Sequence, residues 1–320
     1  MFLFSPRQCY LNNYCFYAIM KSMFGDSHFH LSYLDSYGID TVSMMQSLAK
    51  SKIPYLLDIG THCDDLSKRA ALSDDIVSSI ALSDADLAEH VQKTLFFASG
   101  IWPAPEAIAD RFTQMAELEH QIQAFKKDGF RHFKGSSLIA VGECGLDHHW
   151  NIDGPDNRDK NAFSASLLHG EAEMFEMHLN LAKNLDLPII VHSRDAFDGT
   201  LACIKNCGYH KGIIHCYSYG IEEARSFIDL GWYISFSGSV TYAKRSKIES
   251  VYEMLRFVPK DRLLLETDAP YLAPVPNRGK TNTPLFIKDT YSFVSQALCM
   301  DSVSAAQMVL QNFNTLFGLN

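Results

Sequence analysis

Four histidines and two carboxylates each interrupt a short apolar run, a pattern that is typical of metal ligands. The six residues are His28, His30, Glu143, His192, His215 and Asp268. Imidazole nitrogens and carboxylate oxygens are the usual protein ligands of divalent cations such as zinc. Any one of these residues could be an ordinary hydrogen-bonded polar side chain, but six such interruptions favour a shared metal centre.

The number of candidate ligands indicates how many ions the centre would hold. His28 and His30 are two residues apart, so both imidazoles point to the same face of a strand and can bind one cation. Six ligands exceed the four of a tetrahedral zinc site and suit two cations about 4 Å apart that share a carboxylate. Glu143, midway in strand order, is the predicted bridge. Two dications outweigh the two carboxylate charges, which favours an anionic phosphodiester as substrate.

These residues need elements that bring them together, and eight apolar runs alternate with amphipathic segments along the chain. The runs are Phe24–His30, Tyr55–Gly60, Leu95–Ile101, Leu138–Glu143, Leu187–His192, Gly212–Tyr217, Trp232–Phe236 and Arg262–Asp268. The alternation predicts an α/β fold, a (β/α)8 TIM-like barrel rather than an open doubly wound sheet. Barrel enzymes place their active sites at the carboxyl ends of the strands, where the six candidate ligands fall.

Helical patterns lie between most of the runs, and two more follow the last run as extra C-terminal helices. They cover Tyr37–Ala49, Ala104–Lys127, Phe163–Leu185, Ala196–Cys207, Ile221–Leu230, Ser246–Leu255, Pro284–Leu298 and Ser302–Phe317. Residues 24–320 are therefore expected to form a single barrel domain. Residues 1–23 are interpreted as an N-terminal extension, which is disordered, packed on the surface or located before the true translation start.

Loops and isolated polar residues add further expectations. The segment His149–Lys160 has the composition of a loop and follows a strand, which predicts a position at the barrel mouth. Asp147 is expected to brace the loop after Glu143, and Asp195 to cap a helix. Six further histidines in predicted helices or loops are expected at the surface, namely His90, His120, His132, His169, His178 and His210.

The composition limits the possible functions. The chain has 320 residues and a net charge of −9, which argues against a basic nucleic-acid-binding surface of the usual kind. Its eight cysteines form no C-x-x-C pair, which favours reduced thiols and a cytoplasmic location. No apolar run reaches the roughly 18 residues of a membrane span. We therefore expect no membrane association and no obligate protein partner.

Six sequence motifs together resemble the TatD family of metal-dependent deoxyribonucleases within the amidohydrolase superfamily. The motifs are H-x-H, VGECGLD, IIVHSRDA, IIHCYS, YISFSGSVTY and LLLETDAPYL, and the match runs from about Phe24 to the C-terminus. The resemblance implies a distorted TIM barrel and hydrolysis of DNA or similar phosphodiesters. It also implies divalent ions, commonly Mg²⁺ and in some members Zn²⁺ or Mn²⁺.

The resemblance assigns roles to individual residues. One ion would be bound by His28, His30 and Asp268, the other by His192 and His215, with Glu143 shared. Asp268 is the expected catalytic residue, together with Glu143, because it can also take a proton from the attacking water. The predicted substrate contacts are Arg194, Trp102 and Arg278. Arg194 fits a phosphate oxygen or a surface salt bridge, and Trp102 fits stacking on a base or packing at the rim.

Two segments depart from the family pattern. The family usually carries G-I-H-P-H after the third strand, where this chain has Gly100-Ile101-Trp102-Pro103-Ala104. After the last strand, R-G-x-R-N-E-P is replaced by Arg278-Gly279-Lys280-Thr281-Asn282-Thr283-Pro284. The candidate metal ligands are retained, so these departures concern substrate contacts and loop anchoring.

Three alternatives remain open. One is a hydrolase of the same superfamily that acts on a small phosphoester, an amide or a lactone. Many binuclear members of that kind use a carbamylated lysine at the end of strand four, where this chain has Glu143. The second is a metal-binding scaffold without catalysis, and the third is a nucleic-acid-binding module, which the acidic composition disfavours.

Overall fold

The computed structural model describes residues 24–149 and 164–319. The proposed N-terminal extension, residues 1–23, and all but the first residue of the predicted loop His149–Lys160 lie outside the described residues.

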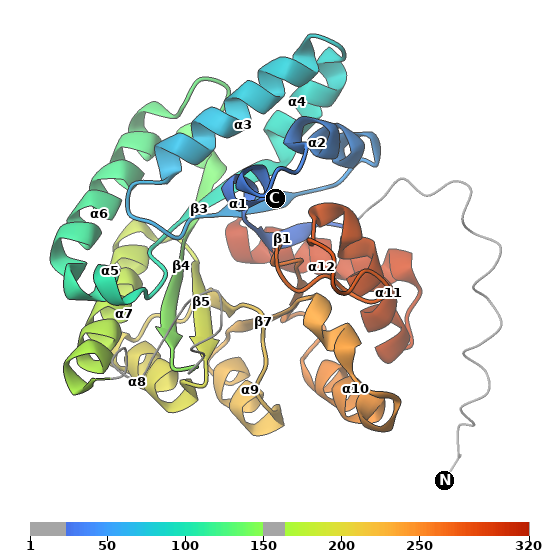
Figure 1. The fold of residues 1–320 in the computed structure, drawn as a ribbon. Helices are drawn as coiled ribbons and strands as arrows, with labels where there is room; N and C mark the ends of the chain where they lie inside the picture. The colour runs from blue at the N-terminus through green and yellow to red at the C-terminus, as the bar shows by residue number, and fades with distance from the viewer. Residues whose placement is uncertain (1–23, 150–163, 320) are drawn as a thin grey trace.

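Eight parallel strands form a sheet in the order β1 to β8, and Figure 1 shows strands in the middle of the molecule. They are β1 (Asp26–Phe29), β2 (Leu56–Ile59), β3 (Leu95–Ser99), β4 (Leu138–Asp147), β5 (Ile189–Arg194), β6 (Gly212–Ile214), β7 (Tyr233–Phe236) and β8 (Leu263–Leu265). The segment after β8 meets β1 through the bridge between Phe29 and Ala269, which nearly closes the barrel. The predicted (β/α)8 barrel is confirmed.

The described helices surround the strands (Figure 1). They are α1 (Leu31–Ser36), α2 (Thr41–Lys50), α3 (Leu66–Ala81), α4 (Ala85–Thr94), α5 (Pro105–Ala109), α6 (Arg111–Asp128), α7 (Ala165–Leu185), α8 (Phe197–Cys207), α9 (Ile221–Ile228), α10 (Ile248–Phe257), α11 (Ile287–Ala297) and α12 (Ser302–Phe317). Short 3₁₀ turns are η2 (Gly135–Ser137), η4 (Gly238–Tyr242), η5 (Arg245–Lys247) and η6 (Pro284–Phe286).

No helix is predicted from the sequence between β2 and β3, where α3 and α4 lie. The buried side of α3 explains the omission because it carries polar residues, including Arg69 and Ser73. Arg69 donates from Nη1 to Asp58 Oδ2 at 2.7 Å and from Nη2 to the carbonyl of Ala98 at 2.7 Å. A helix that packs on the barrel through a buried arginine lacks the apolar periodicity on which the prediction relied.

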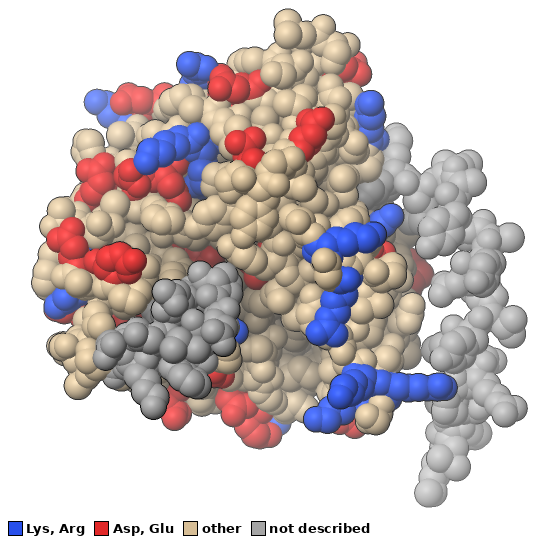
Figure 2. All heavy atoms as spheres, in the orientation of Figure 1, with Lys and Arg blue, Asp and Glu red and all other residues tan. Residues whose placement is uncertain are grey.

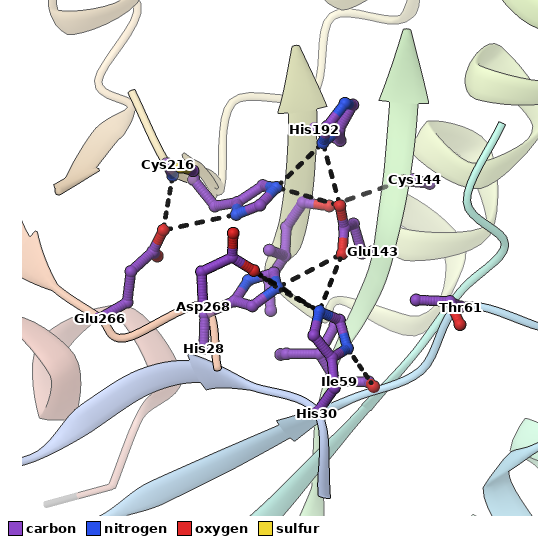
Figure 3. A network of polar contacts seen from close by, with 12 residues as sticks. His28, His30, Ile59, Thr61, Glu143, Cys144, His192, Cys216, Glu266 and Asp268 are labelled. Atoms are coloured by element: carbon purple, nitrogen blue, oxygen red, sulfur yellow. Dashed lines mark hydrogen bonds and ion pairs between the residues drawn. The ribbon is translucent and has the colours of Figure 1, made fainter. Parts of the chain in front are cut away.

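Strand β4 differs from the prediction in the position of its end. It continues to Asp147, so that Glu143 lies inside the strand instead of at its last residue. The register with β5 shifts between Val141 and Cys144, next to Gly142 with φ +137°. Such a positive φ favours glycine, and the irregularity accompanies the inward direction of the Glu143 side chain seen in Figure 3.

No single described helix is long and apolar enough to cross a membrane. One bent pair, Pro284–Ala297 with Ser302–Phe317, passes the length and composition criteria only when both helices are taken together across a 105° bend.

Candidate metal centre

The six predicted ligands converge inside the mouth of the barrel, and Figure 3 labels five of them, His28, His30, Glu143, His192 and Asp268. The donor atoms of five of the six form two overlapping groups, and within each group all donor atoms lie within 4.8 Å of one another. The groups are His28, Glu143 and His215, and His28, His30 and Asp268. The sixth, His192, joins the cluster through its Nδ1, 3.0 Å from Glu143 Oε1. The strand order of the barrel therefore brings together residues that are up to 240 positions apart in sequence.

The first half of the centre is built on β1 and the segment after β8. His28 Nε2 lies 3.3 Å from His30 Nε2 and 3.7 Å from Asp268 Oδ1. His30 Nδ1 faces the carbonyl of Ile59 at 3.1 Å. Because that nitrogen donates its proton to the carbonyl, the lone pair of Nε2 faces the centre.

The second half of the centre is built on β5 and the end of β6. His192 Nδ1 lies 3.2 Å from His215 Nε2. On the outer side, His192 Nε2 lies 2.9 Å from Asp147 Oδ2, to which it donates. Asp147 therefore holds this ring with Nδ1 facing inward, which is a more direct role than the loop brace predicted from the sequence.

Glu143 lies between the two halves and gives one oxygen to each. Its Oε2 is 3.3 Å from His28 Nε2 and 3.7 Å from His30 Nε2. Its Oε1 is 3.0 Å from His192 Nδ1 and 3.1 Å from His215 Nε2. The side chain is almost completely buried. This division of two oxygens between two pairs of imidazoles is the arrangement expected of a bridging carboxylate.

The charges in the centre favour ionised carboxylates. Burial would by itself raise the pKa of Glu143, but the charge of His215 and hydrogen bonds with His192 and His215 hold this pKa well below its usual range. Burial would lower the pKa of His192, but hydrogen bonds with Asp147 and Glu143 raise it to about 9. The carboxylates thus attract positive charge into the centre, which is the electrostatic preference of a cation site.

Two further acidic residues contact the predicted ligands or the segments that carry them. Glu266 accepts from the backbone N–H of Cys216 and from Ser235 Oγ at 2.6 Å, and its Oε1 lies 3.4 Å from His215 Nδ1. Asp26 accepts from the N–H and the hydroxyl of Thr267 at 2.9 and 2.6 Å. Asp26 therefore ties β1 to the segment that carries Asp268.

The donor set fits divalent cations. Two nitrogens that bind one ion at about 2.0–2.1 Å in tetrahedral geometry lie about 3.3 Å apart. The His28–His30 and His192–His215 pairs have nitrogen separations of 3.3 and 3.2 Å. Lone pairs that face each other at this distance need a cation or a proton between them, and mixed imidazole and carboxylate donors suit divalent ions.

The three predicted substrate contacts lie outside this cluster. The Trp102 ring stands edge-on to the His192 ring with centroids 5.9 Å apart. Arg194 is the last residue of β5 and is half-buried. The Arg278 guanidinium lies 4.3 Å from the centroid of the Tyr242 ring. Trp102 adjoins the second half of the centre, whereas Arg278 belongs to the loop before η6.

Two predictions about other polar residues were wrong. Asp195 was expected to cap a helix, but Ala196 is the N-cap of α8 and no side chain caps it. The Asp195 carboxylate instead lies 2.7 Å from His149 Nδ1. His178, expected at the surface, is completely buried, donates from Nδ1 to the carbonyl of Met174 and accepts from the N–H of Ile101 at 3.1 Å.

A (β/α)8 barrel with imidazole and carboxylate donors gathered at the carboxyl ends of its strands is typical of metal-dependent hydrolases. The sequence model of the family described as "TatD related DNase" matches residues 25–318, and the chain belongs to this family.

Individual relatives agree with this membership. The chain is 31% identical over 278 residues to the "Uncharacterized metal-dependent hydrolase YcfH" of Escherichia coli strain K12, covering 83% of this chain and 97% of the relative. It is 33% identical over 190 residues to a Rahnella protein named "3'-5' ssDNA/RNA exonuclease TatD", covering 58% of this chain and 66% of that protein. The crystal structure of the TatD homolog YjjV from E. coli K12 matches with a TM-score of 0.68 at 23% identity, covering 93% and 99% of the two chains, which shows the shared fold.

Proposed function

We propose that this metal-dependent hydrolase is a two-metal phosphodiesterase that degrades nucleic acid, most simply as a deoxyribonuclease of the exonuclease type. The observation that carries the proposal is the position of Glu143, whose two oxygens face two separate pairs of imidazoles. One ion would be held by His28, His30 and Asp268, and the other by His192 and His215. Mg²⁺ is the first candidate, with Zn²⁺ or Mn²⁺ as alternatives.

Bound divalent ions supply Lewis acidity, which makes hydroxide available from water near neutral pH. Asp268 is the proposed base. Burial opposes its ionisation, but the hydrogen bond with His30 and the charge of His28 lower its pKa, so that the side chain is an ionised carboxylate at neutral pH. Its Oδ1 faces His28 and His30, and its second oxygen points away from these rings in Figure 3.

Substrate contacts would come from the rim around the centre. Trp102 adjoins His192 and offers an aromatic edge or face to a base or sugar. Arg194, which follows His192 on the same strand, and Arg278 are the proposed phosphate contacts. The name of the Rahnella relative supports a nucleic-acid strand as substrate. The scattered cysteines, of which the six described ones are free thiols, support a reducing compartment such as the cytoplasm.

The proposal is tested with full-length protein reconstituted separately with Mg²⁺, Mn²⁺ and Zn²⁺. Hydrolysis is measured on single-stranded DNA, double-stranded DNA, RNA and bis(p-nitrophenyl) phosphate. We expect about two metal equivalents, cleavage of nucleic acid and at least about a hundredfold loss of turnover in Asp268→Asn. Asp229→Asn, an exposed aspartate at the end of α9, is the matched control and keeps the wild-type rate.

Other outcomes contradict specific parts of the proposal. Turnover of a small ester, amide or lactone without cleavage of any nucleic acid would reassign the substrate class. A stoichiometry of one ion that Glu143→Gln leaves unchanged would remove the bridging role of Glu143.

A further inference from the structure

A groove of about 510 Å³ opens on the rim beside the metal centre. Its walls come from the loop between β6 and α9, from η4 and from α10, and they include Tyr217, Tyr219, Tyr242 and Met254. The groove starts next to the proposed ligands because Tyr217 follows His215 by two residues. Tyr219 Oη also contacts Ser193 Oγ at 2.9 Å, and Ser193 follows His192 directly.

One edge of the groove carries a cluster of cations, which we call the basic edge. It consists of Lys244, Arg245, Lys247, Arg278 and Lys280, all of them exposed. No acidic residue occurs within 239–248 or 274–283. Such a local excess of positive charge contrasts with the net charge of −9 for the whole chain.

The two sequence segments of the basic edge are joined in space. Tyr242 Oη donates to the carbonyl of Ala273 at 2.9 Å, and the N–H of Val275 donates to Thr241 Oγ1 at 2.9 Å. Arg278 lies over the Tyr242 ring, so a cation of the basic edge touches a wall of the groove. The neighbouring ion pairs involve other side chains, namely Arg225 with Glu222, Arg256 with Glu249 and Arg262 with Asp261.

The charge around the groove is one-sided. Figure 2 shows Lys and Arg side chains gathered on the side where α10 and α11 lie, whereas most Asp and Glu side chains lie on the opposite side and along the lower margin. The α9 edge carries Glu222 and Glu223 in its first turn. A polyanion crossing this face would therefore keep its charges on the basic edge and away from α9.

We propose that the groove and its basic edge bind a single strand of nucleic acid as it leads to the metal centre. This inference rests on the proposed function for its substrate class. Single-strand sites combine a cationic track for the backbone with aromatic side chains for the bases. Here the basic edge supplies the track, and the half-buried rings of Tyr219 and Tyr242 line the groove. Tyr219 also contacts Ser193, the neighbour of the proposed ligand His192, at the end of the groove nearest the metal centre.

The test compares two triple variants of the full-length, metal-reconstituted protein. The first is Lys244→Gln, Arg245→Gln, Lys247→Gln. The matched control is Lys126→Gln, Lys127→Gln, Lys134→Gln, which removes three exposed cations at the opposite end of the barrel, where α6 ends and β4 begins. Binding is measured by fluorescence anisotropy with a labelled phosphorothioate oligothymidylate of about 20 nucleotides, which resists hydrolysis. Equal thermal unfolding midpoints verify that both variants are folded.

We expect the slope of log affinity against log salt concentration to be shallower by about 2 in the basic-edge variant than in the wild type. Each single-strand phosphate contact contributes about 0.7 to this slope, and the variant removes three cations. At about 0.1 M salt this corresponds to roughly a hundredfold weaker binding. The control variant keeps the wild-type slope. Equal slopes in both variants would overturn the inference while leaving the proposed function intact.

Two further outcomes separate the inference from the proposed function. If the basic edge binds the oligonucleotide but the protein cleaves no nucleic acid, the proposed function fails and the binding surface stands. If the wild type binds phosphatidylserine vesicles through the basic edge and ignores the oligonucleotide, the surface recognises anionic lipid and the inference is overturned.

Discussion

Replacing Asp147 by asparagine tests whether this residue sets the orientation of one metal ligand. Asp147 Oδ2 accepts from His192 Nε2 at 2.9 Å, and its Oδ1 accepts from the N–H of His149 at 2.9 Å. An asparagine side chain has only one acceptor oxygen, so its amide NH₂ must face one of these two N–H groups. If His192 loses its acceptor, the ring rotates or moves its proton to Nδ1, and the lone pair that faces Glu143 is lost.

The size of the effect follows from the interaction that is removed. A buried hydrogen bond to a charged group contributes about 1.5–3 kcal/mol, which corresponds to roughly 10–100-fold in affinity. We therefore expect Asp147→Asn to weaken the binding of the ion next to His192 and His215 by about 10–100-fold. Binding of the ion near His28 and His30 should not change. Turnover should fall at low metal concentration and recover at high concentration.

Titration calorimetry with Mn²⁺, combined with rates at increasing metal concentration, measures both effects. The control is Asp195→Asn, since this carboxylate touches the neighbouring His149 and lies outside the metal centre. If both ions bind equally more weakly, or if neither affinity changes, Asp147 does not orient His192 and the centre is not divided into two halves.

Three further predictions concern the rim, the core and the last loop. Trp102→Ala should raise KM for single-stranded DNA about 5–100-fold with a smaller change in kcat, while Trp102→Phe keeps most of the affinity; an unchanged KM in the alanine variant contradicts the stacking role. His178 has its pKa lowered by burial from 6.5 to about 4, so the folded state binds fewer protons than the unfolded state and stability falls as the pH drops from about 6.5 towards 4. The loss approaches about 3 kcal/mol in urea unfolding, and His178→Gln should make this pH dependence shallower by that amount. Asn282→Ala should cost about 2–3 kcal/mol of unfolding free energy because buried Asn282 donates to the carbonyls of Thr267 and Tyr271, whereas exposed Thr281→Ala should change it by less than about 0.5 kcal/mol.

The sequence predicted those features that depend on repeated local patterns. Each strand is a short apolar run, and parallel strands in sequential order leave their carboxyl ends at one rim. A ligand-type residue at the end of such a run could therefore be placed in the shared mouth without any knowledge of tertiary contacts. The arrangement of His28, His30, His192, His215 and Asp268 at the mouth follows from this rule.

The residues that hold the ligands carry no comparable pattern. Glu143 projects from the middle of β4 because the strand continues to Asp147 through an irregular register. Asp26 begins β1 and reaches Thr267, 241 positions away. His178 looks like a surface histidine on an amphipathic helix, yet it satisfies a backbone N–H of the loop after β3. Such partners are fixed by tertiary packing between distant segments, which single-sequence periodicity does not encode.

The departure at Trp102 and Ala104 can be interpreted in the same terms. Both residues line a cavity of about 170 Å³ that also includes Tyr33, Thr61 and His62. A chain of short contacts crosses this cavity wall, from Tyr33 Oη to Thr61 Oγ1 at 2.7 Å and on to His62 Nδ1 at 2.9 Å. The loop after β3 thus presents Trp102 and Ala104 to this cavity, while α1 and the loop after β2 contribute hydroxyl and imidazole groups. Because loops at a barrel mouth vary independently of the strand ends, the candidate metal centre could be predicted from the strand ends, whereas the side chains around this cavity could not.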